Sequence, residues 1–295
     1  MRGLLTRHLY ALAVGGSLVA FGIGRALGWP PEAVVLASSV LTLMAGAVLE
    51  RWAPFDPQWA KPRDDVATDA TSAVVLIGLV DPLLKAVLPV LAIALLQGVG
   101  QPGRPGWFLA DAPFGVQVLA ALLWVEFAKY WSHRAHHTLG GLWQLHALHH
   151  GSERLYWLNN FRFHPLNHAL NALVSLLPLW LLGVPAEVLL GATALTQPVL
   201  MLQHANIDLR SGWLNRVFST NELHRWHHSA RPSEANSNFG SALVLWDHVF
   251  GTFRHPGGAA RPARIGLFGS SSGYPARGSY LRQLLAVFMP PCCRA

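Results

Sequence analysis

The segments HRAHH (residues 133–137), HALHH (146–150) and HRWHH (224–228) dominate this sequence. Twelve of the fifteen histidines lie from His133 to His228. Nine of these twelve form the three clusters, and the other three are His164, His168 and His204. Long apolar runs precede and separate the clusters. We therefore expect the apolar runs to form a helical scaffold that brings the three clusters together.

The composition indicates a membrane protein. The 295 residues are 52% apolar and only 13% charged, unlike an ordinary soluble domain. The net charge of +7 does not predict nucleic-acid binding, because the arginines lie in loops between apolar runs rather than on one polar face. The two cysteines, Cys292 and Cys293, are adjacent, so neither a disulfide framework nor a cysteine metal site is expected.

Six apolar runs have about the length of membrane crossings: 9–28, 32–50, 69–98, 114–131, 166–183 and 185–203. Run 69–98 is long and contains Asp81-Pro82, so it predicts either one kinked, tilted crossing or two re-entrant halves. Counting it as one crossing places all three clusters on the same face of the membrane. The arginines around the clusters predict that this face, and the N-terminus, are cytoplasmic.

The predicted fold class is all-α, a polytopic membrane helical bundle with a cytosolic histidine-rich helical cap. Residues 1–113 are expected to form N-terminal transmembrane helices and loops, and residues 114–253 the region that bears the histidine clusters. Residues 254–295 are rich in Gly, Ser, Pro and Arg, which predicts a polar, mobile tail.

Helical spacing predicts how the clustered histidines share metal ions. His133 and His137 lie four residues apart and share a helix face, and His146 likewise stacks with His149 and His150. Adjacent residues diverge by about 100° on a helix. One member of an adjacent pair can therefore bind one metal while its neighbour reaches a second. The same spacing recurs at 224–228, so two metals are implied, and imidazole suits iron, zinc, copper or nickel.

The remaining histidines receive different interpretations. His164 and His204 are expected to be ligands, whereas His136 and His168 are left between an outer-shell and a substrate-facing role. His136 points about 100° away from the face of His133 and His137. Ordinary packing or hydrogen bonding explains three isolated histidines, His8, His248 and His255.

Several motifs resemble those of the fatty acid hydroxylase/sterol desaturase superfamily. The first are YWSHRAHH at 130–137 and LWQLHALHH at 142–150. Later motifs follow in the same order: RFHP at 162–165, HAN at 204–206, ELHRWHH at 222–228, NFG at 238–240 and WDHVFGT at 246–252. The resemblance covers roughly residues 114–253.

The resemblance implies an integral-membrane di-iron oxygenase, in which O2 and external electrons hydroxylate or desaturate a lipid or sterol-like substrate. The cofactor would be two iron ions, with zinc as a possible substitute, and a separate protein would donate electrons. No catalytic residue beyond the metal centre is assigned. Asp208 and Glu222 are either partners that orient imidazoles or ordinary loop charges. The family's ligands, completed by the two single histidines, would fall on His133, His137, His146, His149, His150, His164, His204, His224, His227 and His228.

Two alternatives stay open at this point: a zinc-dependent membrane hydrolase and a non-enzymatic metal-binding membrane protein. A zinc hydrolase rarely uses eight or more imidazoles, and no His-Glu-x-x-His motif occurs. A transporter would hold its ligands at mid-span. The sequence does not separate hydroxylation from desaturation or ether cleavage.

Overall fold

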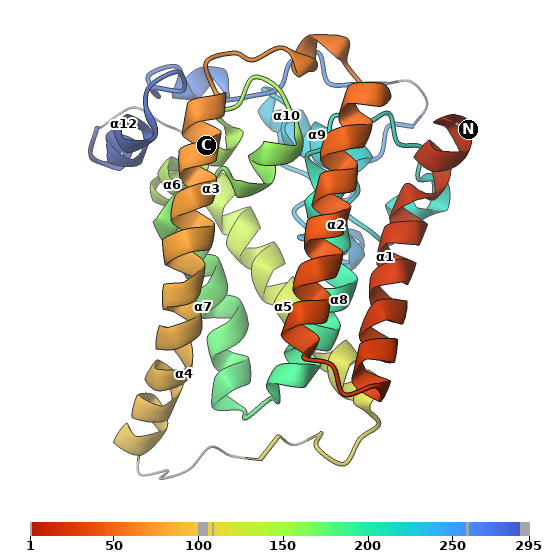
Figure 1. Cartoon of the computed structure of the whole chain (residues 1–295). Helices are drawn as coiled ribbons and strands as arrows, with labels where there is room; N and C mark the ends of the chain where they lie inside the picture. Colours follow the sequence, from red (N-terminus) through yellow and green to blue (C-terminus); the bar gives the residue numbers. More distant parts are fainter. Residues whose placement is uncertain (1, 100–105, 108, 258–259, 290–295) are drawn as a thin grey trace.

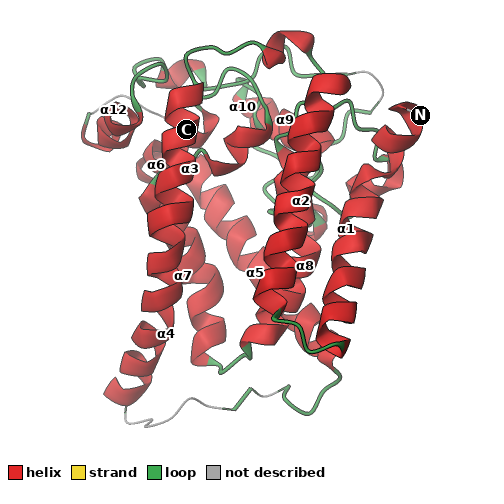
Figure 2. Cartoon of the chain, in the orientation of Figure 1, coloured by secondary structure: helices red, strands yellow, loops and turns green. Residues whose placement is uncertain are grey.

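The computed structural model describes residues 2–99, 106–107, 109–257 and 260–289. Cys292 and Cys293 lie outside the described residues. The described part is helical and contains no β-strand, so the predicted all-α bundle is confirmed (Figure 2).

Eight helices of ten or more residues form the body of the described chain: α1 (Arg2–Ala26), α2 (Pro31–Trp52), α3 (Val66–Val75), α4 (Asp81–Gly98), α5 (Phe114–Thr138), α6 (Gly140–His150), α7 (Pro165–Leu181) and α8 (Ala186–Gln203). Four shorter helices follow: α9 (Asn221–His227), α10 (Pro232–Ala235), α11 (Leu245–Val249) and α12 (Tyr280–Leu284). Single turns are η1 (Pro57–Ala60), η2 (Leu76–Val80), η3 (Trp157–Phe161), η4 (Gly212–Arg216), η5 (Gly269–Ser271) and η6 (Leu285–Phe288).

The long helices run side by side, and the histidine-bearing elements gather at one end of them (Figure 1). Helix α8 packs against α1, α2 and α5, and α7 packs against α5 and α4. Helices α6, α9, α10 and α12 lie at the same end as the N-terminus, whereas the α1–α2 and α7–α8 turns lie at the opposite end (Figure 1). The scaffold therefore brings the three clusters to one end of the bundle.

Run 69–98 lies in one continuous helical rod, so the alternative of two re-entrant halves is wrong. Helix α3, the π-helical turn η2 and α4 follow one another without a break, from Val66 to Gly98. Pro82 cannot donate a backbone hydrogen bond, and the wider π turn just before it absorbs that loss. At about 1.5 Å per residue the rod is about 50 Å long, more than the roughly 30 Å of a bilayer core.

Within the described part of the chain, three helices are long and apolar enough to span a membrane, namely Leu5–Ala26, Pro31–Trp52 and Val66–Gly98. The other three predicted crossings fall on α5, α7 and α8. Helices α7 and α8 have 17 and 18 residues, near the lower limit for a crossing. The count of six crossings therefore stays a prediction.

The described part of the expected C-terminal tail packs against the histidine end. Phe268, Tyr274 and Tyr280 are buried in a cluster with Trp143 and Leu148. The Trp143 indole also donates to the Ser271 hydroxyl at 2.8 Å. Residues 264–289 therefore cap α6, which does not fit the expectation of a mobile tail; the apolar residues spaced through this polar segment provide the contact.

Candidate metal centre

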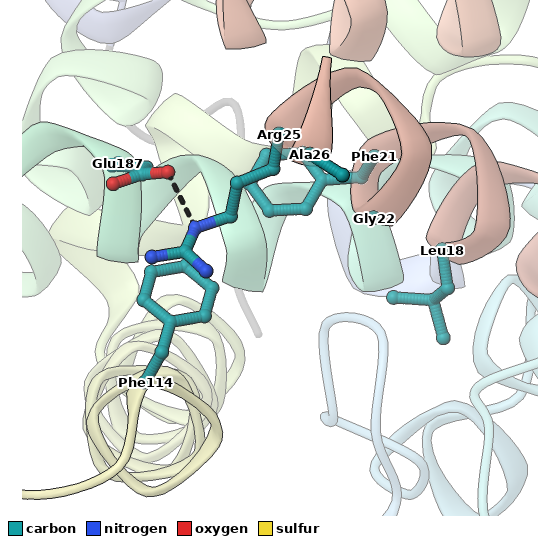
Figure 3. Close-up of a pocket in the computed structure, with 7 residues that line it drawn as sticks. All are labelled: Leu18, Phe21, Gly22, Arg25, Ala26, Phe114 and Glu187. Carbon is teal, nitrogen blue, oxygen red and sulfur yellow. Dashed lines mark hydrogen bonds and ion pairs between the residues drawn. The ribbon is translucent and has the colours of Figure 1, made fainter. Parts of the chain in front are cut away.

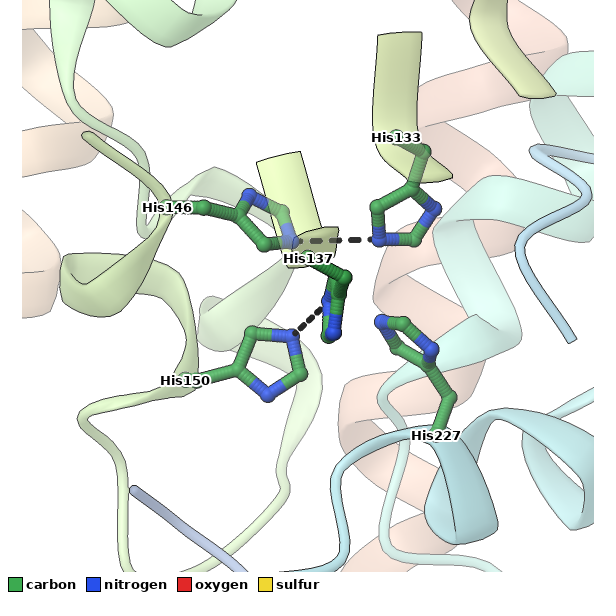
Figure 4. Close-up of side chains that lie close together, drawn as sticks. All are labelled: His133, His137, His146, His150 and His227. Atoms are coloured by element: carbon green, nitrogen blue, oxygen red, sulfur yellow. Dashed lines mark hydrogen bonds between the residues drawn. The ribbon is translucent and has the colours of Figure 1, made fainter. Parts of the chain in front are cut away.

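Nine of the ten predicted ligands converge in two adjacent groups. Site A contains His133, His137, His146, His150 and His227 (Figure 4). Site B contains His149, His204, His224 and His228. Within each group, one ring nitrogen from every residue lies within 4.8 Å of the others. All nine side chains are buried except the half-buried His133.

The ends of four helices supply these side chains. His133 and His137 belong to the last two turns of α5, and α6 carries the second cluster. His204 and His228 are the residues that end α8 and α9. The neighbours His149 and His150 divide between sites B and A, and so do His228 and His227. This division follows the rotation of about 100° between adjacent helical residues.

Backbone carbonyls hold the proton of three rings on Nδ1. His133 donates from Nδ1 to the Phe239 carbonyl at 2.9 Å, His149 to that of Arg162 at 3.1 Å, and His227 to that of Ser237 at 2.9 Å. A carbonyl can only accept, so each of these rings must carry its proton on Nδ1. Its Nε2 then presents a lone pair, as metal-binding histidines do.

Asparagine side chains accept the Nδ1 hydrogen of three further rings. The Nδ1 atoms of His137, His146 and His204 lie 3.2, 2.8 and 2.7 Å from asparagine Oδ1 atoms. The acceptors are Asn236, Asn167 and Asn160, respectively. Sequence reasoning missed these oxygens, because an asparagine that orients a histidine leaves no spacing signal.

The inward-facing nitrogens are arranged as a cation would require. Nε2 of His204 lies 3.0 Å from Nε2 of His224 and 3.2 Å from that of His228. In site A, Nε2 of His227 is buried and has no hydrogen-bond partner among the described residues. Lone pairs that face one another repel, and a buried polar atom without a partner is costly. Both features fit metal ions bound by imidazole.

Burial keeps these imidazoles neutral. It lowers the pKa of His204 to about 3 and that of His227 to about 4. Burial is also the main cause that lowers the pKa of His146, His149 and His150, followed by the neighbouring imidazoles. A neutral ring is the form that binds metal. The sites are therefore ready for a metal at neutral pH.

Arg162 ties site B to distant parts of the chain. Its guanidinium donates to Asp69 at 2.6 Å, to the Leu148 carbonyl at 2.8 Å and to Gln283 at 2.9 Å. Arg162 and Asp69 are fully buried. Since the Arg162 carbonyl also holds His149, this network links α3, α6 and α12 to the ring that site B needs.

Aromatic rings enclose the histidines. Phe163 stacks on His149 with 4.1 Å between ring centres. Trp143 stacks on Phe268 at 4.6 Å and lies 5.1 Å from the ring of His137. Phe239 lies 5.4 Å from His137. These rings exclude water from both sites.

The structure separates His164 from both sites. Its Nδ1 accepts a hydrogen bond from the Leu166 amide at the start of α7. Its ring also hydrogen-bonds the backbone at Leu284. His164 thus caps the start of α7 and belongs to neither group of converging nitrogens.

His136 acts on site A through an asparagine. Its Nδ1 donates to the Ser132 carbonyl at 2.7 Å, and its Nε2 accepts from Asn167 at 3.0 Å. Asn167 in turn holds His146. His136 is therefore one residue removed from the metal-binding groups, whereas His137 is part of site A.

Three other candidates, His168, Asp208 and Glu222, belong to neither site. His168 pairs with Asp81 at 2.6 Å. Asp208 forms an exposed ion pair with Arg210. Glu222 accepts from the Ser211 amide and Asn215. Among the described residues, neither Asp208 nor Glu222 forms a hydrogen bond or ion pair with a histidine of either site.

An open cavity exists at the other end of the bundle. Arg25, Phe114 and Glu187 line it, together with Leu18, Phe21, Gly22 and Ala26 (Figure 3). Phe114 begins α5, whose last two turns carry His133 and His137. At about 1.5 Å per residue, some 30 Å separates this cavity from the histidines, so it is not part of the metal centre.

Comparisons with known proteins agree with this geometry. The family model "Fatty acid hydroxylase" matches residues 118–252, which include all nine histidines of sites A and B. The chain is 34% identical to ornithine lipid hydroxylase OlsE of Rhizobium tropici, over 97% of this chain and 83% of the relative.

Alkylglycerol monooxygenases are more distant relatives. The chain is 29% identical to that of Caenorhabditis elegans, over 45% of this chain and 26% of the relative. It is 31% identical to that of Danio rerio, over 45% of this chain and 29% of the relative. No solved structure matches the chain.

The relatives are a hydroxylase and monooxygenases, so they favour an oxidoreductase over the zinc hydrolase and the non-enzymatic metal-binding protein. The histidine sites and the family match together indicate iron binding. The similarity to the ornithine lipid hydroxylase extends over nearly the whole chain, and the chain belongs to the fatty acid hydroxylase family.

Proposed function

We propose that this chain is a membrane-bound di-iron oxygenase that hydroxylates a lipid with O2 and electrons from a separate donor protein. Site A would hold one iron through five histidines, and site B would hold the second through four. The observation that carries the proposal is the set of six rings whose Nδ1 atoms are hydrogen-bonded to oxygen acceptors. Their Nε2 lone pairs are thereby directed into two adjacent sites.

Iron bound in the two sites would supply the one-electron chemistry that activates O2. The protein's own groups orient the imidazole rings and keep water away from the two sites. Carbonyls of Phe239, Arg162 and Ser237 keep protons on Nδ1. The aromatic rings around the histidines exclude water, which prevents side reactions of reactive species.

We propose a membrane lipid with an amino-acid headgroup as the substrate. The full-length similarity to an ornithine lipid hydroxylase supports this choice. The alkylglycerol monooxygenases match only the histidine-bearing half of the chain. Hydroxylation is therefore favoured over desaturation and ether cleavage.

We further propose a multi-pass topology with the histidine end facing the cytoplasm. The N-terminus and the histidine sites lie at the same end of the bundle (Figure 1). Arg134, Arg210 and Arg231 lie within or near the segments that carry the histidine clusters, and positively charged residues next to membrane crossings favour a cytoplasmic location. Tags at the N-terminus and the C-terminus should both be inaccessible from outside intact cells. An externally accessible C-terminus contradicts this topology.

The enzyme proposal is tested in a host that makes ornithine lipid. Expression of the chain should produce a lipid that carries one additional oxygen atom, and growth under isotopically labelled O2 should label that atom. Mass spectrometry of the total lipids measures both. The purified protein should contain about two irons per chain, as two imidazole sites require. Unchanged lipids in cells that contain the iron-loaded protein contradict the proposed function.

A further inference from the structure

The rod from Val66 to Gly98 contains the most apolar stretch of the three candidate spans. It nevertheless carries three charged side chains: Asp69, Asp81 and Lys85. Asp69 is fully buried against Arg162. Among the residues that the structure describes, Asp81 and Lys85 form no buried ion pair of this kind. Because charged groups within an apolar span are costly, their presence indicates a functional site.

Asp81 forms a partly exposed pair with His168 of the neighbouring helix α7. His168 donates from Nε2 to Oδ1 of Asp81 at 2.6 Å, and the two side chains are 33% and 40% exposed. No further hydrogen bond joins Oδ2 of Asp81 or Nδ1 of His168 to a residue that the structure describes. Two polar atoms of the pair are therefore open to a ligand. Asp81 directly follows the π turn η2, a local geometry that is frequent at functional sites.

Lys85 adds a positive charge one helical turn from Asp81. Residues four apart lie on the same side of a helix, and helical side chains point toward the N-terminal end. Lys85 therefore lies on the same side of α4 as Asp81, one turn further along. Lys85 is exposed and forms no ion pair with the described residues. A negative and a positive group on one side of α4 are therefore both open to a ligand.

This charged group lies close to site B. His168 is in the first turn of α7, which begins at Pro165 at the histidine end of the bundle. The ring of His168 lies 6.5 Å from that of Phe163, and Phe163 stacks on His149 at 4.1 Å. A single aromatic ring thus separates the pair from a histidine of site B.

We propose that Asp81, Lys85 and His168 form a headgroup subsite for a zwitterionic lipid that carries a free ammonium and a free carboxylate. Asp81 binds the ammonium, Lys85 binds the carboxylate, and His168 holds the Asp81 carboxylate in place. This inference rests on the proposed function, because it assigns a substrate class to the same centre. The short distance to His149 places the oxidised carbon near the headgroup rather than at the far end of an acyl chain.

The test uses iron-loaded protein in detergent and three short-chain lipids: ornithine lipid, its N-acetyl derivative without the positive charge, and its methyl ester without the negative charge. Isothermal titration calorimetry measures the Kd of each. The wild type should bind the zwitterion about tenfold or more tightly than either derivative, as expected for hydrogen bonds to charged groups. Asp81→Asn should lose only the preference for the free ammonium, and Lys85→Gln only the preference for the free carboxylate.

If Asp81 and Lys85 only held α4 against α7, each variant would weaken the binding of all three lipids alike. A separate loss of one preference in each variant therefore indicates direct contact with the headgroup. Glu187→Gln is the matched control, because Glu187 pairs with Arg25 at similar exposure at the other end of the bundle (Figure 3). It should retain both preferences. Equal binding of the three lipids by the wild type, or equal weakening in both variants, overturns the subsite. A wild type that oxidises ornithine lipid without this discrimination leaves the proposed function intact.

Discussion

Sites A and B use the same ligand type but are held in place by different parts of the molecule. Site A relies on the two histidines of α5 and on nearby oxygen acceptors such as Phe239 and Asn236. Site B contains His149, whose acceptor belongs to Arg162, and Arg162 is anchored on Asp69 of the apolar rod. Site A is therefore supported near the histidines, whereas site B depends on contacts with α3 and the C-terminal segment.

Two sites with the same ligand type can therefore differ in how easily a distant change disturbs them. Breaking a buried ion pair leaves an unpaired charge and typically costs about 3–5 kcal/mol. A change far from the histidines, at Asp69, can therefore reach site B through a backbone carbonyl. No described ion pair makes the equivalent connection to a histidine of site A.

The largest effects are expected from the adjacent ligands of α6. His149→Ala should remove the metal from site B, and His150→Ala should remove it from site A. Each should reduce lipid oxidation by more than about a hundredfold, beyond the usual effect of losing an outer partner. Iron per chain and Mössbauer spectra of the variants measure the result. The exposed His248, changed to Ala, is the control; the assignment is wrong if either cluster variant keeps full activity and iron.

The second prediction concerns the anchor of site B. Asp69→Asn should lower the free energy of unfolding by about 3–5 kcal/mol and release iron from site B before site A. Asp65→Asn is the matched control, since Asp65 forms an equally short, buried pair with Arg154, whose carbonyl accepts from Ser152 rather than a histidine. It should destabilise the protein without changing the distribution of iron. Equal iron loss in both variants argues against a specific tie to His149.

A smaller effect is expected at His136. His136→Ala removes the acceptor for Asn167, which holds His146 of site A. Iron affinity or activity should fall about 10–100-fold, whereas His137→Ala should be inactive. His136→Gln offers an amide oxygen to Asn167 and should recover part of the loss. Product formed per bound iron is the measurement, and the reverse ranking of the two alanine variants would move the ligand from His137 to His136.

The smallest expected effect is the loss of stability of the metal-free protein for each unit by which the pH is lowered. Above about pH 6.5 the histidines are neutral in the folded and unfolded chains, so stability does not change with their titration. Below about pH 6.5 the histidines of the unfolded chain bind protons. In the folded chain His227 stays neutral down to about pH 4 and His204 down to about pH 3. Over this range, each ring that stays neutral in the folded chain should lower the free energy of unfolding by about 1.4 kcal/mol per pH unit as the pH falls.

Thermal unfolding in detergent from pH 7 to pH 4 measures this loss of stability, and histidine NMR signals measure the protonation of the rings. Stability that stays constant over this range contradicts the neutral, buried state of the rings.

Much of this site could be predicted from residue spacing. The positions of His133 and His137 and the division of His149 from His150 follow from helical geometry, because neighbours within one helix keep a set rotation. The all-α class follows from apolar runs that are long enough to span a bilayer. These features depend on residues close together in the chain, where backbone geometry alone decides the outcome.

Contacts between distant segments were decided only by the tertiary structure. His204 joins site B, whereas His164 caps α7, although both looked like single ligands between clusters. The anchoring of Arg162 on Asp69 joins residues 93 positions apart. The C-terminal segment covers Trp143 instead of forming a separate tail. Helical periodicity carries no information about which helix ends meet, because packing between whole helices decides their positions.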